Sequence, residues 1–158
     1  MATEIYYAGL DLGQQADFSA FTVVEQIGPN YSIRHLQQWP LQTPYPKIVE
    51  DVVALFRRPP LAGSTLCVDA TGVGVAIVDM FRQAKPDCRL VPITIVGGKN
   101  ASFAGGGFHV PKKDLVAVLQ VLLSSRRLQI APAHLVLGLQ PHAAVRRGYT
   151  YIAITDHS

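Results

Sequence analysis

Residues 65–74, TLCVDATGVG, indicate a βα unit, because an apolar strand ends at an acidic residue and turns through glycines into a helix. Apolar residues recur at helical spacing over residues 48–56, and a second helical pattern covers residues 75–84. The run RLVPITI at 89–95 predicts another strand. We expect both strands to be buried on their two faces, because neither alternates apolar with polar residues. This helix–strand–helix–strand order predicts parallel pairing with right-handed crossovers.

The N-terminal third of the chain has a different pattern. Residues 5–11 (IYYAGLD), 19–27 (SAFTVVEQI) and 31–39 are rich in β-branched and aromatic residues and are separated by short turns. Strands joined by tight turns pair in an antiparallel way. The sequence therefore predicts a three-stranded antiparallel meander that the parallel strands extend, which is an α/β fold.

The segment that follows the parallel strands begins with a glycine-rich stretch, residues 96–109, which we expect to be a loop. A helix is predicted over residues 112–125, directly after Pro111. Its apolar residues surround most of its circumference, so we expect this helix to be buried. Residues 128–130 predict a short last strand.

Composition narrows the class of protein. The 158 residues fit one domain, and a content of 49% hydrophobic residues excludes intrinsic disorder. Charged residues make up only 16%, against roughly 25% in ordinary domains, which indicates apolar surface that contacts either a partner or a part of the protein outside these residues. The net charge of +3 permits nucleic-acid binding without arguing for it. Two cysteines without zinc-site spacing, and no signal or membrane-spanning pattern, predict a cytoplasmic protein that does not associate with membranes.

Two acidic residues are the candidate catalytic and metal-binding residues. Asp11 and Asp69 each end an apolar strand, and each is followed by a glycine-containing turn. If these strands are neighbours, both carboxylates emerge at the same edge of the sheet, where ligands gather in α/β folds. A divalent cation relieves the repulsion between two close carboxylates, and hard oxygen ligands suit Mg²⁺ or Mn²⁺. Two such ions can hydrolyse a phosphodiester.

A plainer role for each acid stays open at this point. An aspartate after a strand is often a turn former or the N-cap of the following helix. Spacing alone does not separate that role from metal binding at either position.

The sequence resembles the nuclease domain of phage terminase large subunits over about residues 5–131. The resemblance is carried by four segments in the same order along the chain: YAGLDLGQ with SAFTVVE (7–14 and 19–25), CVDATGVG (67–74), VPKKDLV (110–116) and RLQI (127–130).

The resemblance implies an RNase H-like fold, with helices on both faces of the sheet, that cleaves double-stranded DNA with two Mg²⁺ or Mn²⁺ ions. Asp11 would hold both ions and Asp69 one. The family has a third acid near its C-terminal end, and the only candidate here is Asp156. The segment 132–158 departs from the family's ending, so we expect residues 1–131 to form the nuclease core and 132–158 an atypical tail of the same domain.

Partners follow from the same resemblance. The chain has no GxxxxGK[ST] motif, so an ATPase motor domain and a portal-like protein are implied as partners beside DNA. Lys99, Lys112 and Lys113 border the glycine-rich stretch and are candidate contacts to DNA phosphates. The alternative for these lysines is a solvated basic edge without a ligand.

Two other functions fit the same residues. A catalytically incomplete domain would bind DNA or a protein partner without cleaving DNA. An actin-like ATPase would use the turns after Asp11 and Asp69 to approach nucleotide phosphates through backbone N–H groups.

Overall fold

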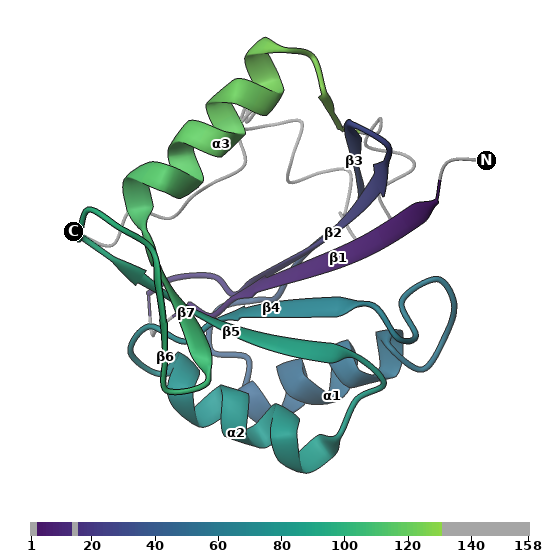
Figure 1. Ribbon diagram of the computed structural model, residues 1–158. Coiled ribbons are helices and arrows are strands. Elements are labelled where there is room, and N and C mark those ends of the chain that lie inside the picture. Colours follow the sequence, from purple (N-terminus) through teal and green to yellow (C-terminus); the bar gives the residue numbers. More distant parts are fainter. Residues whose placement is uncertain (1–2, 14–15, 131–158) are drawn as a thin grey trace.

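The structure, a computed structural model, describes residues 3–13 and 16–130, which form one mixed eight-stranded sheet and three helices (Figure 1). Asp156 and the segment 132–158 lie outside the described residues. The strand order is β6-β7-β5-β4-β1-β2-β3-β8. The elements in chain order are β1 (Glu4–Asp11), β2 (Ala20–Ile27), β3 (Asn30–Gln38), α1 (Tyr45–Leu55), β4 (Thr65–Asp69), α2 (Gly74–Ala84), β5 (Arg89–Val96), β6 (Ser102–Ala104), β7 (Gly107–Pro111), α3 (Lys112–Ser124) and β8 (Leu128–Ile130).

The sheet confirms the predicted meander and its parallel extension. β1 pairs antiparallel with β2, and β2 with β3. On the other side of β1, β4 pairs parallel with it, β5 pairs parallel with β4, and β7 pairs parallel with β5. The carboxyl ends of β1, β4, β5 and β7 therefore all lie at the same edge of the sheet.

The main core lies between the sheet and the two helices α1 and α2, which lie side by side on one face (Figure 1). In β1 the buried residues Ala8 and Leu10 alternate with half-buried ones, and in β4 Leu66 and Val68 do the same. The expectation that β4 is buried on both faces is therefore wrong: its side chains alternate between the helix-covered face and the opposite face, which we call the open face. The expectation that β5 is buried is also wrong, because all of its residues are half-buried or exposed.

Two glycines lie where the chain passes too close to itself for a side chain. A Cβ at Gly13 would overlap with the carbonyl oxygen of Asp17, and a Cβ at Gly74 would overlap with that of Asp69. The turns that follow Asp11 and Asp69 thus need glycine for close packing.

The glycine-rich stretch is not wholly a loop, in contrast to the prediction for residues 96–109. It contains the antiparallel hairpin β6–β7, in which Ala104 pairs with Gly107 across a two-residue turn. Gly105 and Gly106 have φ values of +61° and +79°. Positive φ at both central residues is the signature of the type I′ turn, which matches the twist of a hairpin and strongly favours glycine.

The prediction that the helix over 112–125 is buried is also wrong. α3 lies on the open-face side of the sheet, opposite α1 and α2 (Figure 1), and none of its residues is buried. Val118 and Val121 are 60% and 57% exposed. Within the described part of the chain, no helix combines the length and apolarity needed to cross a membrane.

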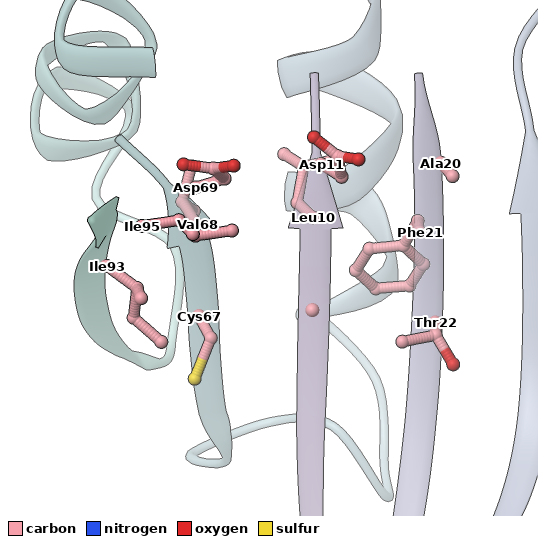
Figure 2. A pocket seen from close by; sticks show the side chains of 11 residues that line it. Leu10, Asp11, Ala20, Phe21, Thr22, Cys67, Val68, Asp69, Ile93 and Ile95 are labelled. Atoms are coloured by element: carbon pink, nitrogen blue, oxygen red, sulfur yellow. The ribbon is translucent and has the colours of Figure 1, made fainter. Parts of the chain in front are cut away.

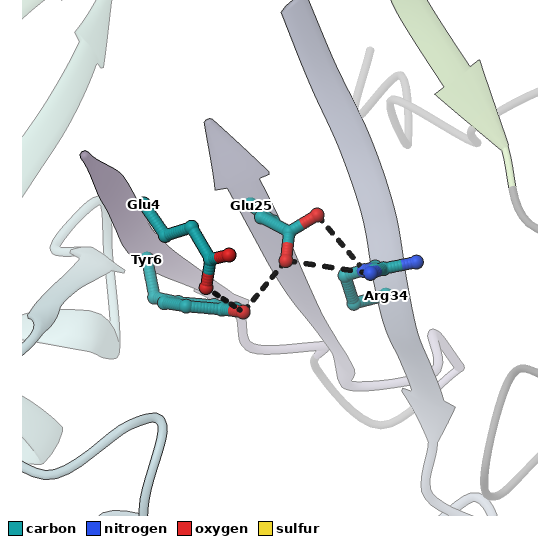
Figure 3. A network of polar contacts seen from close by, with 4 residues as sticks. All are labelled: Glu4, Tyr6, Glu25 and Arg34. Carbon is teal, nitrogen blue, oxygen red and sulfur yellow. Dashed lines mark hydrogen bonds and ion pairs between the residues drawn. The ribbon is translucent and has the colours of Figure 1, made fainter. Parts of the chain in front are cut away.

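A buried carboxylate ties the three strands of the meander together (Figure 3). Glu25 of β2 is 4% exposed; it accepts a 2.6 Å hydrogen bond from the Tyr6 hydroxyl of β1 and forms a 3.1 Å ion pair with Arg34 of β3. The hydrogen bond to Glu25, together with burial, raises the pKa of Tyr6 to about 12. A buried charge is tolerated only when it is paired and hydrogen-bonded, so these contacts hold the meander in register.

We expect Tyr6→Phe to lower the free energy of unfolding by about 1–2 kcal/mol near neutral pH, because the buried carboxylate loses a donor. The folded-state pKa of Tyr6 lies above its ordinary value of 10.0, so the contribution is complete below pH 10 and is lost as the pH rises toward 12. Denaturant unfolding at several pH values measures it. Tyr7→Phe, on the same strand, is the control, and a difference between wild type and Tyr6→Phe that does not shrink above pH 10 would contradict the prediction.

We expect Gly74→Ala to destabilise the chain by about 1–3 kcal/mol, because the added methyl group must displace the carbonyl of Asp69. Each kcal/mol corresponds to roughly 2–4 °C in the midpoint of thermal unfolding for a chain of this size. Gly97→Ala is the matched control, since a Cβ there meets nothing within 4 Å. Equal midpoints of thermal unfolding for Gly74→Ala and Gly97→Ala would show that the turn after β4 can accommodate a methyl group.

Candidate functional site

The two predicted acids lie on adjacent parallel strands at the same edge of the sheet (Figure 2). The ladder between β1 and β4 ends with Leu10 opposite Val68, and Asp11 and Asp69 are the next residue on each strand. Neighbouring strands are about 4.8 Å apart. Both acids alternate with residues buried under α1 and α2, so their side chains belong to the open face. The structure thus brings together the pair that the sequence singled out.

Asp69 also shapes its own turn. One oxygen, Oδ1, accepts a 2.8 Å hydrogen bond from the backbone N–H of Thr71, and the Thr71 hydroxyl accepts a 3.1 Å bond from the N–H of Ile95. The turn role considered for Asp69 is therefore real. The N-cap role is not, because α2 is capped by Val73 without a side-chain hydrogen bond. The turn bond uses one carboxylate oxygen and fixes the direction of the other.

The loop after Asp11 is held by polar contacts to Gly13. The backbone N–H of Gly13 donates to the hydroxyl of Ser19 at 3.1 Å, and its carbonyl accepts from the Tyr45 hydroxyl at 3.0 Å. Ser19 is buried, and its carbonyl accepts a bond from the N–H of Trp39. These contacts join the ends of β1, β2 and β3 to the start of α1 and so set the position of Asp11.

A pocket of about 250 Å³ lies at the two carboxylates, and its other walls are mostly apolar. It includes two polar side chains that the sequence analysis did not single out, Cys67 and Thr22. Burial raises the pKa of the Cys67 thiol, which keeps it neutral and a poor nucleophile. The Thr22 hydroxyl is buried and has no hydrogen-bond partner within the described residues. The sequence contains a signal for both. Cys67 lies two residues before Asp69, and Thr22 lies two residues after Ala20, which pairs with Asp11, so each shares a face of the sheet with the acids.

The three candidate lysines also come to this edge. Lys99 follows β5, and Lys112 and Lys113 follow β7 at the start of α3, where all three are exposed. Because β5 and β7 run parallel to β4, the segments that follow them leave the sheet at the carboxylate edge. Cations therefore border the acidic pair on the side of β5 and β7.

The residues present fit a divalent cation bound with help from other ligands. Among residues 3–13 and 16–130 there is no cluster of three or more His, Cys, Asp or Glu side chains that could hold a metal. Mg²⁺, however, commonly binds through one or two carboxylates and completes its shell with waters and substrate phosphates. Asp11 and Asp69 supply those carboxylates, while the third predicted ligand, Asp156, is outside the described residues.

Comparison with known proteins gives no match in sequence and clear matches in structure. No protein-family model and no curated protein matches the chain. The large terminase nuclease of thermophilic phage G20c, solved with bound zinc, superimposes with a TM-score of 0.57 at 20% identity, covering 80% of this chain and 63% of that one.

Two other structures match equally well. The human cytomegalovirus terminase nuclease domain, soaked with manganese and bound to an inhibitor, gives a TM-score of 0.56 at 13% identity over 86% of this chain and 67% of that one. The large terminase of another thermophilic bacteriophage gives 0.56 at 11% identity over 80% of this chain. This chain spans only 28% of that protein. The chain therefore has the RNase H-like fold of terminase nuclease domains.

Proposed function

We propose that the chain is a divalent-metal-dependent endonuclease domain that hydrolyses phosphodiester bonds of double-stranded DNA. The observation that carries the proposal is the placement of Asp11 and Asp69 at the carboxyl ends of the adjacent parallel strands β1 and β4. Among proteins of the same fold, one was solved with bound zinc and another after soaking in manganese, which supports a metal-binding role for the domain.

Asp11 and Asp69 would hold Mg²⁺ or Mn²⁺, with Asp156 as a candidate third ligand. When bound, such ions lower the pKa of a water and neutralise charge on the leaving oxygen of the phosphodiester. The turn bond from Thr71 orients Asp69, and the contacts of Ser19 and Tyr45 with Gly13 position Asp11. Lys99, Lys112 and Lys113 would bind phosphates beside the scissile bond.

The partners follow from the fold of the domain. In the second phage protein the matching fold is one part of a longer chain, of which the present chain would correspond to 28%. We infer that the domain acts with an ATPase motor and a portal-like protein in phage DNA packaging, in the host cytoplasm.

A second candidate is a domain that binds DNA or a protein partner without cleaving DNA. It is favoured by one observation: the described residues bring together two acids and no cluster of three metal-binding side chains. Cleavage assays separate the two functions.

We expect the wild-type chain to nick supercoiled plasmid with Mn²⁺ or Mg²⁺, and Asp11→Asn and Asp69→Asn each to lower the rate by at least about 100-fold, since each removes a charged metal ligand. Asp79→Asn is the matched control, because Asp79 is an exposed residue of α2 that pairs with Arg82. Nicking that survives either site substitution would refute this site. DNA binding without any nicking by the wild type would favour the second candidate.

We also expect Mn²⁺ to raise the thermal midpoint of the wild type and to have no such effect on Asp11→Asn or Asp69→Asn. A ligand that binds only the folded state stabilises it by about 2.7 kcal/mol at 100 times its dissociation constant. In EDTA the two variants should unfold at or above the wild-type temperature, because each relieves repulsion between neighbouring carboxylates. A lower midpoint of both variants in EDTA would instead indicate that the structural contacts of the two carboxylates stabilise the fold more than their mutual repulsion destabilises it.

A further inference from the structure

An exposed aromatic pair lies on the hairpin β6–β7. Phe103 and Phe108 are 65% and 42% exposed, and their rings meet edge to face with centroids 5.0 Å apart. Single exposed apolar side chains are common on protein surfaces, but two large aromatic rings in contact on an edge hairpin are a feature that needs a partner.

The register of the sheet places this pair in line with the catalytic candidates. Phe103 pairs with Phe108, Phe108 pairs with Ile93, and Ile93 pairs with Asp69. Directly paired residues point to the same face of a sheet, so both rings lie on the open face, level with Asp69. Ile93 also lines the pocket at the carboxylates, so the aromatic pair continues that surface toward the edge of the sheet.

The distance from the pair to the acids suits a nucleic-acid strand. Phe108 is two strands from Asp69, which corresponds to roughly 10 Å at about 4.8 Å per strand. At the ~3.4 Å rise of a stacked strand, that is about three nucleotides. A strand with its phosphate at Asp69 would therefore bring a base close to the rings.

The charge around the hairpin agrees with a polyanionic partner. Residues 97–113 contain three lysines and one histidine and no acidic residue. Cations that bind the backbone, together with aromatic faces on which bases stack, are the combination that proteins use for single-stranded nucleic acids.

We propose that Phe103 and Phe108 form a stacking site for unpaired bases of the DNA strand, about three nucleotides from the phosphate that metal ions at Asp11 and Asp69 would bind. This inference deepens the proposed nuclease function and rests on it. It means that double-stranded DNA is bound with its bases unpaired beside the scissile phosphate, so a frayed end or a locally opened duplex is a better substrate than a fully paired one. In an intact duplex the flat faces of the bases are covered by their neighbours and are not available to the rings.

The test is binding of a fluorescent single-stranded oligonucleotide and of the blunt duplex of the same sequence, measured by anisotropy in EDTA. We expect the wild type to prefer the single strand. Phe103→Leu and Phe108→Leu remain apolar but lack a flat face, so each should weaken single-strand binding by about 5- to 150-fold, the effect of losing one stacked base. Phe103→Tyr should bind like the wild type, and duplex binding should not change.

Val118→Ala is the matched control, because Val118 is an exposed apolar residue of α3, outside the site. Unchanged single-strand binding by both leucine variants would overturn the proposal, as would an equal loss for the duplex. A contact with protein would be indicated instead if the leucine variants bound DNA normally and the wild type associated with itself. Phe103→Ala and Phe108→Ala should then abolish that association. Because the assay contains no divalent metal, its outcome is independent of whether the chain cleaves DNA.

Discussion

The parallel pairing of β1 with β4 places two like charges on neighbouring strands, and the rest of the site follows from that constraint. Leu10 and Val68 end the ladder, and the packing of both under α1 and α2 fixes which face Asp11 and Asp69 must take. Two carboxylates held this way repel each other unless a cation lies between them. The hydrophobic core therefore holds two like charges at one edge of the sheet, which is the arrangement that the proposed cation site requires.

At the same edge, one residue has a structural role beside the functional role proposed for it. Asp69 accepts the N–H of Thr71, and Thr71 in turn accepts the N–H of Ile95, so β4, its turn and β5 are linked by hydrogen bonds. The turn-forming role of Asp69 is therefore compatible with the metal binding proposed for it. The turn removes rotational freedom from the carboxylate before any ligand arrives, and this lowers the entropic cost of binding.

The elements that were predictable from the sequence are those in which the local pattern and the tertiary environment agree. The meander, α1, β4, α2 and β5 have the expected positions, because apolar residues at strand or helix spacing have a single core to face. The predicted burial of α3 is wrong, because apolar residues around the circumference of a helix do not determine whether another element covers it. The hairpin was not predicted, although Gly105-Gly106 is a favoured pair for a type I′ turn. Its strands have only three and five residues, so their sequences show too little periodicity to be distinguished from a loop.

The missed hairpin matters because it lengthens the functional surface. A loop after β5 would end the sheet close to Asp69, whereas β7 and β6 add two strands beyond β5 and carry the row of paired side chains outward from Asp69 through Ile93 to Phe108 and Phe103. Side chains in such a row share one face and one level, so the proposed cleavage at one end and the proposed base contacts at the other would act on the same DNA strand. For a linear substrate bound across such a sheet, the spacing between its contacts is set by the distance between hydrogen-bonded strands. The proposed recognition of a DNA strand about three nucleotides from the scissile phosphate then needs no conformational change.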